Sequence, residues 1–432
     1  MKRRCSAISV VTIVLGLLVA ACAPAKPTAT PTPVVPTPVP TTAPPIPTPV
    51  PQVIKIGGIY PLTGAYAALG EGDKKAIDLA VEEINAAGGI KSLGGAKIQI
   101  IYADSQGDPK IALTEAERLI TQEKVVAILG SILSSTTATS AEVAEKYKIP
   151  YLNEGSTSVT LTEHGWKYFF RATPHDGFYC EEEFKLLKHM EERSGVQVKT
   201  IGLMYENTLF GKTAGDVWKQ LAQKYGYEIV VDIPYDAKVA DLSPEITALK
   251  AAAPDVVLLA SYTQDAILIT KTMKQMDFNA KAVMALDGGQ ILPMYVEAVG
   301  ELANYIFAEA RWNKDLGKPI AQEVNKKYRD RYGVDLDGHN ARAHTAVYVL
   351  YYALEQAAST DPEKLRETLA KIEVPADKIV MGWDGVKFDE KGQNTLGHGC
   401  IVQMLQGEYK TVWPLSVKTA DAVFPVPRWD ER

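Results

Sequence analysis

The chain has 432 residues, of which 46% are hydrophobic, and a mean hydropathy of −0.07, values ordinary for a globular protein with room for two lobes. Its 46 basic and 52 acidic residues give a formal net charge of −6, and no long run of like charge stands out. This balance argues against a disordered chain and against a nucleic-acid or anionic-membrane surface, so we expect a small or neutral partner.

The first 22 residues predict export. Residues 1–21 combine a basic head, an apolar stretch too short for a comfortable membrane span, and two alanines before Cys22. Val-Ala-Ala-Cys at 19–22 resembles a bacterial lipobox, in which the peptidase cuts before the cysteine and the thiol takes a diacylglycerol. We therefore predict a lipoprotein signal peptide at 1–21 and a lipid anchor at Cys22, on the outer face of the cell membrane or in the periplasm. The alternative is an ordinary signal peptide cut near Ala21, which would leave the protein free.

A proline-rich and threonine-rich segment follows at 22–52. Proline at nearly every second or third position favours semi-rigid polyproline II and prevents a packed core. At about 3.1 Å per residue this segment reaches on the order of 90 Å. We predict a lipid-anchored linker that holds a folded head away from a membrane.

From residue 53 onward, short apolar runs alternate with amphipathic helical patterns. The first three runs are "VIKIGGIY", "KIQIIYA" and "VVAILG", and helical patterns at 70–85, 109–122 and 140–147 separate or follow them. The alternation continues after residue 195 with "KTIGLMYE", "YEIVVDIPY", "DVVLLAS" and "AKAVMAL". Such alternation predicts parallel sheets, and we expect two similar α/β lobes with a break near "FRATPHDG".

The turn at Gly211-Lys212-Thr213 raises the question of a nucleotide-hydrolysing enzyme. A phosphate-binding loop needs a glycine five positions earlier, but Glu206 stands there and its charge would repel phosphate. The match therefore fails. Because loops after parallel strands face a shared crevice, Phe210 is predicted to line a cleft; the alternative is a plain helix start beside a surface Lys212.

Other catalytic and metal motifs are missing from the sequence. It contains no Gly-x-Ser-x-Gly elbow and no His-Glu-x-x-His, and its six histidines are scattered. His339 and His344 are five apart, so we expect them to cap or pack rather than bind metal. "DEKGQN" lacks the spacing of a calcium loop. We predict no catalysis, no cofactor and no metal.

Two turns rich in serine and threonine follow strands of the first lobe, in "SILSSTTATS" and "EGSTSVTLT". Helix N-termini attract anions, so Ser134, Gly155 and Thr157 would together bind a carboxylate. The alternative is that Ser134, Ser135, Ser156 and Thr157 only cap helices.

The second lobe offers the complementary chemistry. Tyr262 comes just after one strand, and Asp287 just after another, before two glycines that let a ligand approach the backbone. Asp287 suits an ammonium group and Tyr262 suits packing over it. Alternatively, Asp287 forms an Asx-turn with Gly288 and Gly289. An anion site on one lobe facing a cation site on the other would clamp a zwitterion.

Four stretches together resemble the branched-chain amino-acid-binding proteins of bacterial ABC importers, over residues 53 to about 415. They are "IGGIYPLTGAYAALGEGDKKAIDLAVEEINAAGGI", "ILGSILSSTTATSAEVAEKYKIPYLNEGSTSVTLT", "FFRATPHD" and "GVKFDEKGQN". The resemblance implies a type I periplasmic-binding-protein fold, in which two Rossmann-like lobes, joined by three crossover strands, close on an amino acid. It also implies lobe I at 53–173 and 309–386 and lobe II at 174–308 and 387–432.

The resemblance assigns roles to particular residues. Ser134, Thr157 and the Gly155 backbone would hold the ligand carboxylate, Asp287 would hold its amine, and Tyr262 matches a family tyrosine at the cleft. The remaining predicted ligand contacts are Leu69, Ile132, Ser156 and Phe210.

The pocket departs from the family pattern at three positions. Leu69 and Phe210 stand where the prototypes carry tyrosines, and a pocket phenylalanine is replaced near Ala341. These departures predict a larger or differently shaped side-chain pocket. Arg342 would meet an acidic group of the ligand, or else is a solvated helix residue.

The implied partners are an ABC permease and its ATPase subunits, with the binding protein itself a monomer. One rival function is a sensor for an amide, urea or aromatic acid. The other is a hydrolase, for which Asp287 and His344 would need a nucleophile that the sequence does not offer. Cys180 and Cys400 remain after processing, and either a disulfide between them or two separate buried thiols is expected.

Overall fold

The computed structural model describes residues 52–286 and 288–432, which belong to one compact unit. The predicted signal peptide, Cys22 and nearly all of the predicted linker lie outside the described residues, and so does Asp287. Within the described part of the chain, no helix is both long enough and apolar enough to span a bilayer.

Strands and helices alternate along most of the chain. The strands are β1 (Val53–Tyr60), β2 (Lys97–Asp104), β3 (Ile128–Gly130), β4 (Tyr151–Asn153), β5 (Phe169–Arg171), β6 (Thr200–Glu206), β7 (Glu228–Tyr235), β8 (Val256–Ala260), β9 (Ala282–Leu286), β10 (Phe307–Glu309), β11 (Glu373–Pro375), β12 (Gly385–Lys387), β13 (Ile401–Leu405) and β14 (Glu408–Trp413). The helices are α1 (Ala67–Ala86), α2 (Pro109–Arg118), α3 (Ser134–Tyr147), α4 (Asp176–Ser194), α5 (Leu209–Tyr225), α6 (Ser243–Ala252), α7 (Thr263–Gln275), α8 (Pro293–Val299), α9 (Pro319–Tyr332), α10 (Gly338–Ala357) and α11 (Pro362–Leu369).

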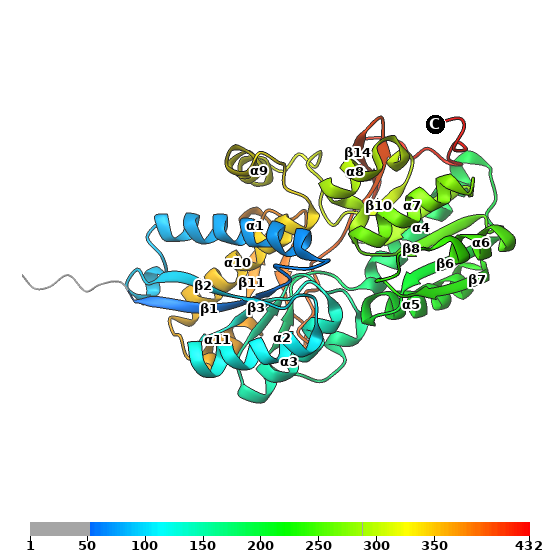
Figure 1. Ribbon diagram of the computed structural model, residues 1–432. Helices are drawn as coiled ribbons and strands as arrows, with labels where there is room; N and C mark the ends of the chain where they lie inside the picture. Colours follow the sequence, from blue (N-terminus) through cyan, green and yellow to red (C-terminus); the bar gives the residue numbers. More distant parts are fainter. Residues whose placement is uncertain (1–51, 287) are drawn as a thin grey trace, which may run out of the picture. The chain divides into compact units, whose positions relative to one another are not determined.

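Five parallel strands form the first sheet, in the order β2-β1-β3-β4-β5. Side chains of β1 point alternately to its two faces. Ile56 packs with buried residues of α1 and α10, whereas Ile59 packs with buried residues of α2 and α3. Figure 1 accordingly shows α1 and α10 on one side of this sheet and α2 and α3 on the other.

Seven strands form the second sheet, in the order β14-β13-β10-β9-β8-β6-β7. Strands β6 to β10 run parallel, and β13 pairs antiparallel with both β10 and β14. Leu258 packs with buried residues of α4 and α5, and Leu259 with those of α6 and α7. Helices on both faces bury a sheet completely, which explains why its strands are continuous apolar runs in the sequence. The predicted α/β fold with two lobes is confirmed.

The chain passes between the two sheets three times, after β5, after β10 and before β13. Where it first crosses, the Arg171 N–H donates to the Gly392 carbonyl at 2.7 Å, and the Asn394 N–H donates to the Arg171 carbonyl at 2.9 Å. The Gln393 amide donates to the Thr173 carbonyl at 2.9 Å. The "DEKGQN" segment therefore joins two of the crossing strands.

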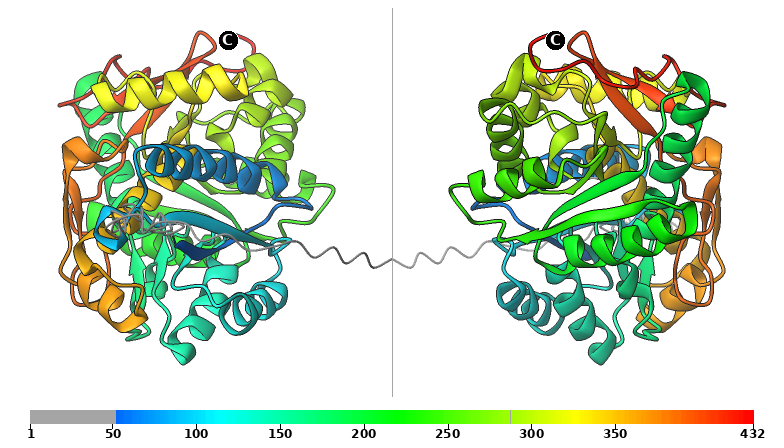
Figure 2. Two further views of the ribbon diagram at one scale, coloured as in Figure 1. Left: turned by 90° about the vertical axis from the view of Figure 1, so that its left-hand side faces the viewer. Right: turned by 90° about the vertical axis from the view of Figure 1, so that its right-hand side faces the viewer.

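Helix α9 shows that the chain returns to the first lobe after β10. Lys327 and Arg331 of α9 pair with Glu83 and Glu82 of α1, and α9 lies above α1 in Figures 1 and 2. The lobes are thus built from discontinuous segments. The lobe boundaries inferred from the family resemblance stay a prediction.

The turn at Gly211 begins α5, and the chain's own carboxylate caps the helix. The Glu206 side chain accepts hydrogen bonds from the N–H groups of Thr208 and Gly211, both at 2.7 Å. A Cβ at Gly211 would lie 2.0 Å from the Glu206 carbonyl oxygen, so this position requires glycine. Lys212 is exposed and Phe210 is buried. Because Glu206 occupies the helix N-terminus, a phosphate cradle is excluded here.

Cys180 and Cys400 are both buried and both free, so the structure contradicts the disulfide alternative and agrees with two separate thiols. Cys180 lies in α4 and packs with the core on one face of the second sheet, whereas Cys400 packs with the core on the other face. The sheet therefore separates them. Burial raises the pKa of each thiol well above its usual value, which keeps both in the unreactive thiol form.

Candidate functional site

The site begins at two turns that follow neighbouring strands of the first sheet. β3 leads to the start of α3 at Ser134, and the adjacent β4 leads to the segment that contains Gly155 and Thr157. The Ser158 N–H donates to the Ser134 hydroxyl at 3.2 Å, which joins the turns. The two serine-rich and threonine-rich turns noted in the sequence therefore lie side by side.

Gly155 is the point of closest approach between these turns. A Cβ there would lie 2.5 Å from the Ser131 carbonyl oxygen and 2.7 Å from the Ile132 Cα. Ser156 joins the turns as well, because its hydroxyl lies 2.6 Å from that of Thr137 and donates to the Ile132 carbonyl at 3.0 Å. Ser156 was predicted to contact ligand, but this hydroxyl is engaged between the turns and does not line the cavity that they border.

A small cavity lies between these turns and the second lobe. Its volume is about 10 Å³, which is roughly enough for one water molecule. The residues that line it are Leu69, Ile132, Ser134, Gly155, Thr157, Phe210, Tyr262, Gly288 and His339. All of the predicted ligand contacts except Ser156 and the undescribed Asp287 are thus brought together from distant parts of the chain.

Aromatic rings form the wall that joins the lobes. Tyr262 precedes α7, and its ring centroid lies 5.6 Å from that of Phe210 and 5.0 Å from that of Tyr66. Tyr66 immediately precedes α1 of the first lobe, one helical turn before Leu69. Sequence reasoning missed Tyr66, although a tyrosine two residues after the "PLTG" turn was a visible signal. The tilted and edge-to-face pairs are favourable arrangements for aromatic rings.

Gly288, which follows the end of β9, lines the cavity with its backbone. Its φ of 137° lies in the region open mainly to glycine, and a Cβ there would lie 2.3 Å from the Ser261 carbonyl oxygen. Glycine is therefore required next to Asp287. Asp287 itself, predicted either to face a ligand or to form an Asx-turn, lies outside the described residues.

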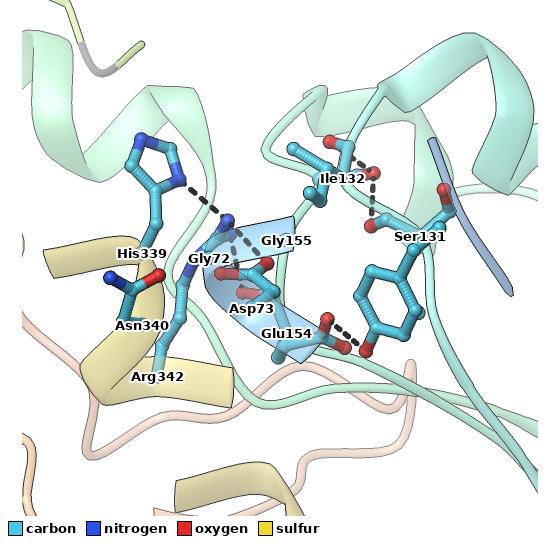
Figure 3. Close-up of polar contacts among 12 residues, drawn as sticks. Gly72, Asp73, Ser131, Ile132, Glu154, Gly155, His339, Asn340 and Arg342 are labelled. Carbon is cyan, nitrogen blue, oxygen red and sulfur yellow. Dashed lines mark hydrogen bonds and ion pairs between the residues drawn. The ribbon is translucent and has the colours of Figure 1, made fainter. Parts of the chain in front are cut away.

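His339 and Arg342 form the cavity's polar support from α10 (Figure 3). His339 lines the cavity and is 2% exposed, so it is more than the capping or packing residue expected from its sequence context. Arg342 is fully buried, which shows that the alternative of a solvated helix residue is wrong. It donates to the Glu154 carbonyl at 2.8 Å and pairs with Asp73 of α1 at 3.5 Å. In the sequence, both residues are polar and stand in the first turns of an otherwise apolar helix, and this contrast could have identified them as site residues.

Two buried carboxyls lie behind the cavity. Glu154 accepts a hydrogen bond from the Tyr60 hydroxyl at 2.6 Å, and burial raises its pKa to about 7. Burial also raises the pKa of Asp73 well above its usual value, although Arg342 opposes the shift. These acids and Arg342 form a network that fixes the loop carrying Gly155.

The described residues offer no metal site. No group of three or more histidine, cysteine, aspartate or glutamate side chains among them could hold a metal ion. His344 lies outside the cavity, 3.1 Å from Glu83 of α1. The cavity presents hydroxyls, backbone, an imidazole and aromatic rings, groups that can form hydrogen bonds and packing contacts with a small molecule.

Comparison with known proteins identifies relatives of this chain. A family model described as periplasmic binding protein matches residues 53–407. Leu/Ile/Val-binding protein homolog 7 of Brucella suis is 28% identical over 384 residues, which cover 86% of this chain and 94% of that protein. Homolog 8 of Brucella abortus is 27% identical over 380 residues, which cover 86% of this chain and 93% of that protein.

Two solved structures illustrate the range of ligands on this fold. A branched-chain amino acid transporter substrate-binding protein from Streptococcus pneumoniae, in complex with isoleucine, has a TM-score of 0.73 and 24% identity, covering 84% of this chain and 100% of that one. An ABC transporter solute-binding protein from Rhodopseudomonas palustris, in complex with 3,4-dihydroxybenzoic acid, has a TM-score of 0.72 and 17% identity, covering 88% and 99%. At these identities the likeness demonstrates the shared fold alone.

Proposed function

This chain belongs to the periplasmic binding protein family, and from that premise we propose that it captures an amino acid or similar small zwitterion between closing lobes and delivers it to an ABC importer. One observation carries the proposal. A single cavity gathers the two hydroxyl-bearing turns of the first lobe and the strand ends of the second, which is the arrangement expected of a clamp for a zwitterion.

The two ends of the ligand are assigned to different lobes. Ser134, Thr157 and the Gly155 backbone would bind the carboxylate, aided by the N-terminus of α3. Asp287 would bind the ammonium group, and Gly288 beside it already lines the cavity. Tyr262 and Phe210 would pack against the ligand.

The N-terminal predictions fit this role. Lipid attachment at Cys22 and a semi-rigid linker would hold the head on the outer face of the membrane, beside a permease and its ATPase subunits. We propose that the protein acts as a monomer and catalyses no reaction.

The proposal is tested by ligand binding to the purified exported protein. A thermal-shift screen against amino acids, short amides, urea and aromatic acids should show stabilisation by an amino acid, because a ligand that binds only the folded state raises the melting temperature. Isothermal titration then compares variants. Asp287→Ala should cost about 2 to 5 kcal/mol, or at least about thirtyfold in affinity, since it leaves an ammonium group without its partner. Ser134→Ala should cost less, about 1.5 to 3 kcal/mol, because the carboxylate keeps its other donors.

Ser135→Ala is the matched control. Ser135 is the next residue of α3 and does not line the cavity, so affinity should be unchanged. If only ligands without an amine stabilise the protein, and Asp287→Ala binds them as well as the native chain does, the amino-acid assignment fails. The protein would then be a receptor for an amide, urea or an aromatic acid.

A further inference from the structure

A second and much larger cavity lies between elements of the two lobes, and we call it the seam cavity. Its volume is about 390 Å³, which is within the range of sites that hold small organic ligands. Part of its wall is the connection between α9 and α10, and another part comes from β13, β14 and the region of α8. It shares no lining residue with the small cavity of the candidate site. The seam cavity is therefore a separate feature of the molecule.

The walls of the seam cavity are mainly apolar. Met404 lines it from β13, and Ile291 and Val296 line it from α8 and the turn before that helix. Leu336 and Val334 line it from the connection before α10. Apolar cavities of on the order of 150 Å³ already take up small aromatic molecules. The seam cavity therefore suits a ligand that is largely apolar.

The charged side chains around the seam cavity already have partners. Asp335 forms ion pairs with Lys314 at 3.1 Å and with Arg329 at 3.2 Å. Glu408 pairs with a nearby lysine of β14 at 2.6 Å, and Asp337 caps α10 by accepting hydrogen bonds from the first N–H groups of that helix. Each charged residue that lines the cavity in the described part of the chain is thus engaged. An uncharged ligand fits this wall best.

One polar group of the wall has no partner. Trp312 lines the seam cavity and is 2% exposed, and its Nε1–H lacks a hydrogen-bond partner among the described residues. The hydroxyl of Tyr409 in the same wall differs, because it donates to the Gln290 carbonyl at 2.5 Å. A buried donor without an acceptor is unfavourable. A carbonyl oxygen in the cavity would supply that acceptor.

We propose that the seam cavity is a second ligand site, which binds an uncharged, mostly apolar molecule whose carbonyl oxygen accepts a hydrogen bond from the Trp312 Nε1–H. The inference does not depend on the amino-acid function, because the two cavities have no residue in common. Since the wall combines elements of both lobes, this ligand acts as an effector that favours the arrangement in which the lobes meet.

A shape-matched pair of compounds tests the proposal. Equilibrium dialysis of the full exported protein measures the affinities of butyrophenone and butylbenzene, which differ only by a carbonyl in place of a methylene group. Both should bind the native protein. Trp312→Phe keeps an aromatic ring and removes the donor, so it should weaken butyrophenone about three- to tenfold and change butylbenzene by less than about twofold. Val296→Trp, at a half-buried position of the wall, should weaken both compounds because it takes up free volume.

Trp383→Phe is the matched control. Trp383 is also a buried tryptophan whose Nε1–H has no partner among the described residues, but it does not line the seam cavity. The control should change neither affinity. If neither compound binds the native protein, or if Val296→Trp leaves both affinities unchanged, the seam cavity is not a ligand site. If Trp312→Phe weakens the two compounds equally or not at all, the preference for a carbonyl is refuted.

Discussion

Glu183 shows what a single buried carboxyl does to the stability of this protein. The side chain is 2% exposed, accepts a hydrogen bond from the Trp218 indole at 2.7 Å, and has no basic partner among the described residues. Burial raises its pKa to about 8. In the unfolded chain the same group ionises near pH 4.3. Between these values the folded protein binds a proton that the unfolded chain has lost, so stability falls as pH rises through this window.

Replacing Glu183 with glutamine should remove this penalty. The amide oxygen can still accept from Trp218, and the group no longer ionises. We expect Glu183→Gln to raise the free energy of unfolding by about 2 to 4 kcal/mol at pH 8 and to change it little at pH 4, as measured by urea denaturation at both pH values.

Glu182 provides the control for this measurement. It is the preceding residue of α4 and also accepts from an indole, that of Trp413 at 2.6 Å, but it is partly exposed and pairs with Lys185. Glu182→Gln should therefore leave the difference between pH 4 and pH 8 unchanged. A Glu183→Gln variant with the same pH dependence as the native chain would show that Glu183 is ionised in the folded state.

Individual site residues differed in how far the sequence revealed them. Ser134, Gly155 and Thr157 were identifiable because polar residues directly after a buried strand have few other roles in an α/β sheet. Arg342 was not identifiable in the same way, because its partners Glu154 and Asp73 lie 188 and 269 positions away along the chain. The same holds for His339, which contacts Gly288 51 positions away, since a polar residue in a helix usually faces solvent.

At the scale of elements, α5 depends on a close approach between its first turn and β6. Gly211 has no room for a side chain, since a Cβ would lie 2.0 Å from the Glu206 carbonyl oxygen. Gly211→Ala should destabilise the protein by about 1 to 3 kcal/mol, because the start of the helix must move away from the strand. Urea denaturation measures the loss, and weaker ligand binding should accompany it because Phe210 is the preceding residue.

Gly317→Ala is the matched control, because a Cβ at Gly317 meets no atom within 4 Å. That change should be neutral or slightly stabilising. Equal stability of Gly211→Ala and the native chain would mean that the first turn of α5 shifts without cost.

The elements themselves were predictable to different extents. The parallel strands β1, β2, β6, β7, β8 and β9 are apolar runs of five to eight residues, and the sequence identifies them. The three-residue strands β10 and β12 are too short to show a period, and their pairing is set by long-range contacts. The role of the "DEKGQN" segment could not be predicted from the sequence, because it joins the crossing strands through partners near residue 172, far away along the chain.

At the scale of the whole folded part of the protein, residues 52–432, the cavity is smaller than its proposed ligand. A volume of about 10 Å³ holds roughly one water molecule, and its wall combines residues from both lobes. The Arg311 guanidinium, just after β10, also donates to the Gly155 carbonyl at 3.2 Å. An amino acid can therefore enter only if the lobes separate.

The last prediction concerns this motion. With fluorescent labels on cysteines at the exposed positions Lys110 in α2 and Lys212 in α5, energy transfer should report a shorter distance between lobes when ligand saturates the protein. A pair at Lys212 and Lys250, both in the second lobe, is the control and should report no change. In Ser134→Ala the same shortening should occur at a higher ligand concentration, because the substitution weakens binding without blocking closure. If saturating ligand leaves the distance between lobes unchanged, the ligand enters a rigid protein, and capture by lobe closure is refuted.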